Sequence, residues 1–512
     1  MSKRAPLTER PRLAVAIIVR NAESLVVETL KSVRSLADVI VVADTGSTDR
    51  TVETVRQYTP NVIQHGWADD FSAARNDCLN FVRTQWILWL DAGETIAPDD
   101  ALALRRFVEL EADLQKAYLL MVRITPAPGA VAAEQIGRVR LVPHSPGIQF
   151  QGRICEDIVA SLAGLQIEVE SLPWQIHRGA VEHDQERKFS RARRNVELTN
   201  LEMTQRGAQP HLLNCLGEAL YCLDERKRAA DCYKQAVGSA TPGSTEMLEA
   251  YYGLLTALDG EEKAVEQQLS VCLEALEIFP LDMQLLCAMG GYVQFQGRLD
   301  LAARSYKTAF LHGRINLQTW HLEDIREITA QCLASACHAL NDDAKAQKFL
   351  EEALQENMQS TRLREALVDL HVNCGRPTEA LQHAMLLPAH LAKPETLEMV
   401  VRGACLAAQG DWIQAVCPLK DAYAAGCRDP LCLRWLTASF TSSGELYQAQ
   451  EVIEEWTRLA PDNSEVIDYE DKLKQLQKQT DGVVELTSLQ KTDSSEGKQQ
   501  VETSLGSIPA PP

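Results

Sequence analysis

The chain has 512 residues, of which 24% are charged, and its formal net charge at pH 7 is −20. An acidic surface of this kind repels nucleic acids and offers no electrostatic attraction to anionic membranes, so we expect no nucleic-acid partner. No apolar run comes near the roughly 18 residues of a membrane span, and residues 1–12 lack the apolar stretch of a secretory signal. We therefore expect a cytoplasmic protein with at most peripheral contact to a membrane.

Apolar runs and helical patterns alternate over the first 125 residues. The apolar runs are short, rich in β-branched or aromatic residues and bounded by polar ones, which indicates buried parallel strands. The order βαβαβαβ predicts a doubly wound α/β domain with a mostly parallel sheet. We expect strands at 13–19, 39–42, 61–64 and 86–90, and helices after Asn21, which can cap the first of them, over 50–58 and over 70–81.

Two of the predicted strands lead into an aspartate, Asp44 and Asp91. In an open α/β sheet the ligand binds outside the carboxyl ends of the strands, so these carboxylates mark the edge where a nucleotide would bind. Gly46 supplies a tight turn after Asp44, and Ser47 and Asp49 offer acceptors to the free amides of the next helix. Asp44 has a second interpretation, as an aspartate that only caps this turn.

Six short blocks follow one another in a fixed order between residues 12 and 200. They are IIVRNAESL, VADTGSTDRT, DDFSAARN, WILWLDAGE, GRICEDI and IHRG. Together they resemble the family 2 glycosyltransferases with a GT-A (Rossmann-like) fold, in the bacterial branch that carries a tetratricopeptide array. The resemblance implies a GT-A domain over 13–205, preceded by a tail at 1–12.

The resemblance also implies a nucleotide-sugar donor and a divalent cation, Mn²⁺ or Mg²⁺, as cofactor. The leaving group is a nucleoside diphosphate whose negative charge grows in the transition state, so a cation must stabilise it. Asp44 would accept from the base or ribose, Arg75 would approach base or phosphate, and Asp91 would hold the metal. A surface salt bridge is the alternative for Arg75. The residues implied in donor binding are Asn21, Asp44, Gly46, Ser47, Asp49, Arg75 and Asn76.

The metal-binding D-x-D block departs from the family, because Gly93 stands where the second carboxylate is normally found. Magnesium and manganese accept water or phosphate oxygens in open positions, so Asp91 with Glu94 or His177 would still hold a metal, at lower affinity. Glu94 has an alternative role as a carboxylate in the first turn of a helix. His177 has an alternative role as a structural histidine.

A second departure is Cys155, which takes the position of the family's histidine beside Glu156. A thiol is a poor proton shuttle unless its pKa is depressed. Glu156 or its neighbour Asp157 is therefore the expected catalytic base, which deprotonates the acceptor nucleophile. The family implies an inverting, single-displacement transfer. For Cys155 itself we expect a small buried residue.

Residues 206–478 have a different pattern, in which small and aromatic residues recur with a period of about 34. A motif of Gly, Ala, Tyr and Ala at spacings of twelve, four and three starts at Gly217 and returns from Gly290 and, with leucine for tyrosine, from Gly403. Small residues are needed where helices cross closely, so the pattern predicts an all-α tetratricopeptide solenoid of about seven repeats. Its concave surface would bind a protein partner, a peptide or a second copy of the chain.

Twelve of the 14 cysteines lie in this second region. They fall in helical segments without a C-x-x-C pair, so we expect small core residues of a reducing cytoplasm and neither disulfides nor zinc ligands. Residues 479–512 are rich in Ser, Thr, Gln, Lys and Glu and have almost no aromatic residue, which predicts a disordered tail.

These patterns predict a glycosyltransferase of the hexosyltransferase type, whose repeats recruit a protein or peptide acceptor or a partner enzyme. Two alternatives stay open. The enzyme would instead act on a lipid-linked or envelope glycan and use its repeats for oligomerisation, or Gly93 and Cys155 would have removed catalysis and left a nucleotide-sugar-binding scaffold. The sugar, the nucleotide and the acceptor have no distinctive pattern, because selectivity is set by loops such as 125–135.

Overall fold

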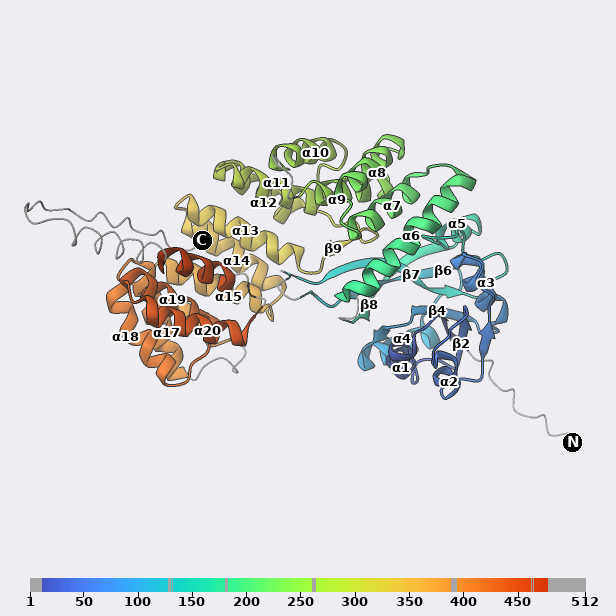
Figure 1. Ribbon diagram of the computed structural model, residues 1–512, viewed down its shortest axis with the longest axis horizontal. Helices are drawn as coiled ribbons and strands as arrows, with labels where there is room; N and C mark the ends of the chain where they lie inside the picture. The colour runs from blue at the N-terminus through green and yellow to red at the C-terminus, as the bar shows by residue number, and fades with distance from the viewer. Residues whose placement is uncertain are drawn as a thin grey trace, which may run out of the picture. The chain divides into compact units, whose positions relative to one another are not determined.

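The computed structural model describes residues 12–127, 130, 132–179, 183–259, 264–387, 394–461, 463 and 465–477. The predicted tails, Arg12 apart, lie outside these residues. The chain divides into two compact units, Met1–Tyr292 with His312–Ile325 and Val293–Leu311 with Arg326–Pro512 (Figure 1). The boundary expected between residues 205 and 206 lies inside the first unit. Among the described helices, none combines the length and apolar character that a membrane crossing requires.

In its described residues the first unit holds a nine-stranded sheet in the order β3-β2-β1-β4-β7-β6-β8-β5, with β9 paired to β7. The first four strands in the chain pair in parallel, as expected from the sequence, and confirm the α/β fold. These strands are β1 (Leu13–Val19), β2 (Val39–Asp44), β3 (Val62–Gln64) and β4 (Trp86–Asp91). The helices that connect them are α1 (Glu23–Ser32), α2 (Thr51–Arg56) and α3 (Phe71–Phe81).

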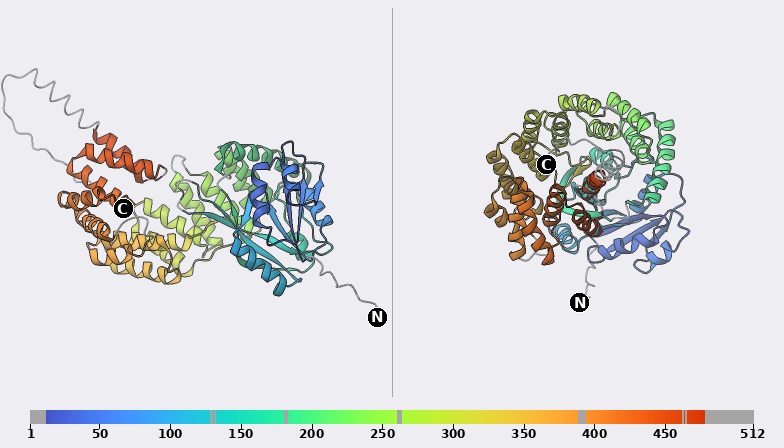
Figure 2. Two further views of the ribbon diagram at one scale, coloured as in Figure 1. Left: turned by 90° about the horizontal axis from the view of Figure 1, so that it is seen from below. Right: turned by 60° about the vertical axis from the view of Figure 1, so that its left-hand side comes forward.

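Strand β1 is buried on both faces, which explains its uninterrupted apolar sequence. Leu13, Val15 and Ile17 pack in one core with helix α1. Ala14 and Ala16 point to the opposite face and pack in a second core with helix α3. The left view of Figure 2 shows helices on both sides of the strands. The strand ends are therefore held rigidly at the edge where the site lies.

Beyond β4 the sheet continues with strands that the sequence analysis did not predict. Gly93, with a φ of 99°, turns the chain from β4 directly into a short strand that begins at Glu94. Glu94 therefore lies in a strand, and its interpretation as a first-turn helix carboxylate is wrong. The later elements are β5 (Glu94–Ile96), α4 (Pro98–Leu110), β6 (Lys116–Ile124), β7 (Glu134–Pro143), α5 (Val159–Gly164) and β8 (Glu168–Arg178).

A long helix, α6 (Gln185–Arg206), leads into seven consecutive helix pairs in the described residues. The first helices of successive pairs contact each other at both ends of this region, α7 with α9, α15 with α17 and α17 with α19, so the predicted repeats are confirmed as a helical solenoid. The pairs are α7 (Pro210–Cys222) and α8 (Arg226–Ser239), α9 (Thr245–Ala257) and α10 (Ala264–Ile278), α11 (Met283–Phe295) and α12 (Leu299–His312), α13 (Ile325–Ala339) and α14 (Asp343–Glu356), α15 (Thr361–Asn373) and α16 (Pro377–Ala384), α17 (Pro394–Ala408) and α18 (Trp412–Ala424), α19 (Pro430–Ser443) and α20 (Leu446–Leu459).

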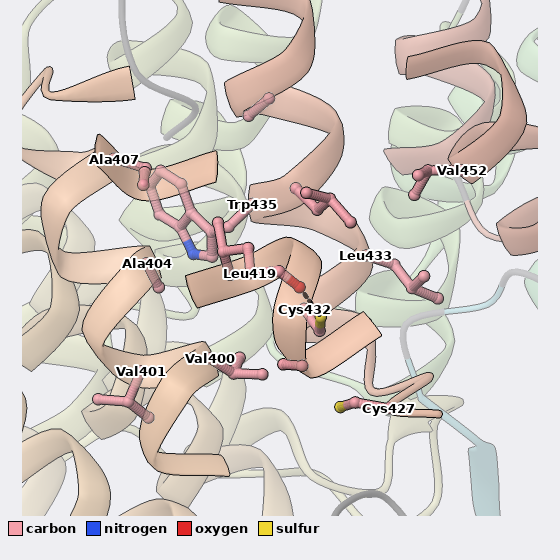
Figure 3. Packing of buried hydrophobic residues seen from close by; sticks show 14 of the residues in the cluster. Val400, Val401, Ala404, Ala407, Leu419, Cys427, Cys432, Leu433, Trp435 and Val452 are labelled. Atoms are coloured by element: carbon pink, nitrogen blue, oxygen red, sulfur yellow. Dashed lines mark hydrogen bonds between the residues drawn. The ribbon is translucent and has the colours of Figure 1, made fainter. Parts of the chain in front are cut away.

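The small residues of the repeat motif lie where helices cross closely. A Cβ added to Gly217 would lie 2.8 Å from the ring of Tyr233, and one added to Gly403 would lie 2.5 Å from Leu419. Figure 3 shows the second of these crossings, where Leu419 and Trp435 pack with Ala404 and other residues of α17. The motif is thus explained by helix packing and needs no functional role.

The segment between α12 and α13 adds the ninth strand to the sheet. β9 (His321–Leu322) pairs antiparallel with Gln135 and Glu134 of β7. Beside it, Arg123 Nε donates to Glu323 Oε2 at 2.6 Å. Sequence analysis did not predict this strand, because two residues carry no periodic pattern. A segment of the repeat region therefore binds both the end of β6 and the start of β7. These are the two ends of the connection that was expected to set selectivity.

Candidate functional site

The loops after β1 and β2 are tied to each other at the carboxyl end of the sheet. Asn21 Oδ1 accepts a hydrogen bond from the Thr48 amide at 2.8 Å, and the Asn21 amide donates to Ser47 Oγ at 2.9 Å. The expectation that Asn21 caps the following helix is wrong, because the N-cap of α1 is Ala22 and the Asn21 side chain reaches across to the second loop. Its positive φ of 49° fits this local turn.

The carboxylates of the second loop also bind backbone amides. Asp44 is buried and accepts from the amides of Gly46 and Ser47 at 3.2 Å, in a turn where Gly46 has a φ of 96°. Asp49 accepts from the amides of Glu23 and Thr51 at 3.2 and 2.9 Å. These bonds fix the shape of the loop. Contact of Asp44 or Asp49 with a base or ribose stays a prediction.

Arg75 on α3 is the centre of the site. Its guanidinium lies 5.6 and 5.3 Å from the ring centroids of Trp89 and Phe150, and only 8% of the residue is exposed. Arg75 Nε donates to Glu156 Oε1 at 2.7 Å, and Nη2 donates to Asp91 Oδ1 at 2.9 Å. The alternative of a surface salt bridge is therefore wrong. Arg75 joins the expected catalytic base to the expected metal ligand.

Asn76, the next residue of α3, makes a structural contact, and its contact with the donor stays a prediction. Its Nδ2 donates to the Phe150 carbonyl at 3.0 Å, and its Oδ1 accepts from the Phe150 amide at 2.8 Å. The oxygen and the nitrogen of the Asn76 side-chain amide therefore both bond the backbone of Phe150. Asn76 holds the segment that supports Arg75, and the structure gives no support to its direct contact with the donor.

Two further arginines, which the sequence analysis did not single out, complete an ion-pair cluster. Arg140 Nη2 and Arg178 Nε donate to Glu94 Oε1 at 2.7 and 2.9 Å. Both arginines also pair with Asp91 Oδ2, at 3.4 and 3.2 Å. Burial alone would raise the pKa of Asp91, but the charges of Arg75 and these two arginines outweigh it and hold that pKa well below its ordinary value. An arginine inside an apolar strand is the sequence signal that could have revealed them, since a buried charge needs a partner.

His177 does not join Asp91 and Glu94. His177 precedes Arg178 on β8, and successive side chains of a strand point to opposite faces of the sheet. The Arg178 side chain lies on the face where it reaches Glu94, so the His177 side chain lies on the other face. The expected ligand set of Asp91, Glu94 and His177 is therefore not assembled. Within the described ranges, the side chains that do gather as a possible ligand group are His338, Asp343 and Cys374, in the second unit.

The remaining carboxylates, Asp91 and Glu94, are poorly arranged for a divalent cation. All four of their oxygens already accept hydrogen bonds, three from arginines and the fourth from the Asp91 amide, so a cation would lie beside three positive charges. The buried atoms of the cluster that have no hydrogen-bond partner are N–H donors, among them Arg75 Nη1, Arg140 Nε and Trp89 Nε1. The cluster thus offers donors to an anion and not acceptors to a metal.

The two candidate bases lie in different surroundings. Glu156 reaches the cluster through Arg75. Asp157 turns away, since its Oδ1 accepts from the Val159 amide at 3.0 Å at the start of α5. Glu156 is therefore the better placed of the two to meet a substrate bound at the strand ends.

Cys155 is neither buried nor free. It is exposed, with a positive φ of 51°, and forms a disulfide with Cys215 of α7. The expectation of reduced cysteines is wrong for this pair, because the fold brings two residues 60 positions apart into contact, which no local spacing reveals. The other eleven cysteines of the second region form no disulfide, as expected. The disulfide attaches the loop of Glu156 to the first helix pair of the solenoid.

We expect the variant Cys155→Ser/Cys215→Ser to lose about 2–4 kcal/mol of unfolding free energy, because the bond closes a long loop in the unfolded chain. Urea denaturation of the oxidised protein measures this loss, and wild type in excess dithiothreitol should match the variant. Cys417→Ser, at an exposed free cysteine, is the control and should unfold like wild type. Equal stability of oxidised wild type and the double variant would contradict a structural disulfide.

Comparison with known proteins agrees with this geometry. Residues 14–117 match the family model described as glycosyl transferase family 2. A TPR repeat-containing protein of Synechococcus elongatus is 34% identical over 158 residues, which cover 30% of this chain and 37% of that protein. The SPbeta prophage-derived glycosyltransferase SunS of Bacillus subtilis is 24% identical over 234 residues, 45% of this chain and 54% of that protein.

The chain thus covers about half or less of the length of these curated relatives. Among solved structures, yeast Tom70 is 14% identical with a TM-score of 0.33, over 60% of this chain and 62% of that one. The family match extends from the second residue of β1 through β4 and includes Asp44, Arg75 and Asp91.

Proposed function

We propose that this chain, whose N-terminal part is a glycosyl transferase family 2 domain, transfers a sugar from a nucleotide-sugar donor to a nucleophile on an acceptor. The observation that carries the proposal is the bridge made by Arg75, which holds Glu156 and Asp91 at 2.7 and 2.9 Å. The bridge lies at the carboxyl edge of the sheet, where ligands of open α/β sheets bind. This position supports Glu156 as the candidate base.

In this proposal Glu156 takes the proton of the acceptor nucleophile as that nucleophile attacks the anomeric carbon. The bond from that carbon to the diphosphate breaks, and its electron pair leaves with the nucleoside diphosphate. Attack from the face opposite the leaving group inverts the anomeric centre. Arg75 acts as a positioning residue, because it fixes the orientation of Glu156.

The helical solenoid is the part that we propose to recruit a protein or peptide acceptor, since stacked helix pairs form extended binding surfaces. A lipid-linked or envelope glycan is the alternative acceptor, with the repeats then used for self-association. The nucleotide-sugar-binding scaffold also stays a candidate, because Glu156 is bonded to Arg75 in this structure. Turnover distinguishes the scaffold from the enzyme.

A donor screen on the purified full-length chain tests the proposal. Panels of UDP-, GDP- and dTDP-sugars are incubated with the protein, and nucleotide release and donor affinity are measured with Mn²⁺ and with EDTA. We expect release from donors of one nucleotide class, above the rate in buffer. Binding without release, with water or any acceptor tried, would support the scaffold. Absence of binding by every donor would contradict both functions.

A further inference from the structure

One face of helix α6 is basic although the chain as a whole carries a net charge of −20. The helix begins near the loop after β1, where Arg187 Nη2 lies 3.4 Å from Ser24 Oγ. Further along, Leu198 packs with Ile154 and with the partly buried ring of Phe71. Helix α6 thus runs beside the loops that form the site. The basic residues of this stretch are Arg187, Lys188, Arg191, Arg193 and Arg194.

Two arginines are held on neighbouring aromatic rings at this place. The Arg20 guanidinium lies 5.7 Å from the Trp67 centroid, and that of Arg194 lies 5.0 Å from the Phe71 centroid. The two rings are themselves 4.9 Å apart. Aromatic faces fix a guanidinium without neutralising it. Both arginines are exposed, and in the described part of the chain neither has a carboxylate within ion-pairing distance.

The aromatic rings connect these arginines to the site, because Phe71 begins α3, the helix that carries Arg75, and the Phe71 amide donates to the Arg153 carbonyl at 3.0 Å. Partial burial and the like charges of Arg191 and Arg20 lower the pKa of Arg194, while Glu156 acts in the opposite direction. In the buried cluster three carboxylates are already paired with three arginines, so none of them is left to pair with Arg20 or Arg194.

We infer that Arg20 and Arg194 bind the diphosphate of the nucleotide-sugar donor. They supply the positive charge that a divalent cation would bring, because Asp91 and Glu94 are poorly arranged to hold such a cation. The inference rests on the proposed function. As the sugar leaves, negative charge grows on the diphosphate oxygens, and guanidinium groups stabilise it by paired charge-assisted hydrogen bonds. The buried N–H of Arg75 Nη1, which has no protein partner, offers a further donor to the same anion.

Nucleotide binding to the full-length chain tests the inference. Calorimetry compares UDP, GDP and dTDP with uridine, guanosine and thymidine, in EDTA and in Mn²⁺. We expect wild type to bind one diphosphate equally well in both buffers and more weakly at high salt. Arg20→Gln and Arg194→Gln should each weaken diphosphate binding roughly 10-fold, and the double variant roughly 100-fold, with nucleoside binding unchanged.

Matched variants separate charge from fold. Arg193→Gln removes an exposed positive charge from the same helix and should bind like wild type. Arg20→Lys/Arg194→Lys keeps both charges but loses the paired hydrogen bonds, so its affinity should lie between those of wild type and the double glutamine variant. Binding that is lost in EDTA and restored by Mn²⁺, or a double glutamine variant that binds like Arg193→Gln, would overturn the inference and leave the proposed function standing. If wild type binds no diphosphate in either buffer, the proposed function itself fails.

Discussion

Glu156→Gln should lower sugar transfer by roughly 10²–10⁴-fold, the usual contribution of a general base, and leave donor affinity unchanged. Glutamine keeps the size of the side chain and can still accept from Arg75 Nε through its carbonyl oxygen, but it cannot take a proton. A base acts on the acceptor and not on the donor. Nucleotide release at saturating donor, with donor affinity measured separately, checks this prediction.

Asp157→Asn is the matched control for this change. Asp157 is adjacent and also acidic, and its side chain accepts a hydrogen bond at the start of α5, so the asparagine variant should support turnover close to that of wild type. If Glu156→Gln turns over normally while Asp157→Asn does not, the base is Asp157. If neither variant changes turnover in an active enzyme, neither carboxylate is the base.

Arg75→Met should destabilise the fold by about 3–5 kcal/mol, because it leaves the Glu156 and Asp91 carboxylates without their shared partner. Methionine fills similar volume between Trp89 and Phe150, so the loss comes mainly from the charge of Glu156, since Asp91 keeps its pairs with Arg140 and Arg178. Urea denaturation at pH 7 measures the change. Transfer should also fall, since Glu156 loses its orientation.

An exposed ion pair provides the comparison. Lys116 pairs with Glu170 at 2.7 Å on the surface of the sheet, and Lys116→Met should change stability little, because water already screens that pair. A loss in Arg75→Met no larger than that in Lys116→Met would show that the cluster around Arg75 is not held by its charges.

The parts of the fold set by local pattern were predictable. Strands β1, β2 and β4 are apolar runs buried on both faces, and the glycines of the repeat motif lie at the close crossings that predicted them. Asp44 and Asp91 were located for the same reason, since a parallel strand fixes where its carboxyl end lies. In each case the signal lies within a few residues of the feature.

The partners of those residues were not predictable by the same reasoning. Arg140 and Arg178 meet Asp91 across three strands whose order in the sheet follows from tertiary packing. The pairing of Cys155 with Cys215 depends on where the first helix pair lies against the sheet. His177 failed as a ligand because strand register decides which face a side chain takes, and a shift of one residue reverses it.

Strand β9 has a consequence for synthesis of the protein on the ribosome. Glu134 pairs with Leu322, which is synthesised 188 residues later. During that interval the first residues of β7, which β4 does not reach, present unpaired backbone groups to other nascent chains. Pairing of such distant segments is slow and leaves folding intermediates open to aggregation. We therefore expect a chaperone that shields these residues to raise the yield of native protein. A stop codon placed before His321 should yield insoluble chains, even though such chains contain every residue of the buried Arg75 cluster.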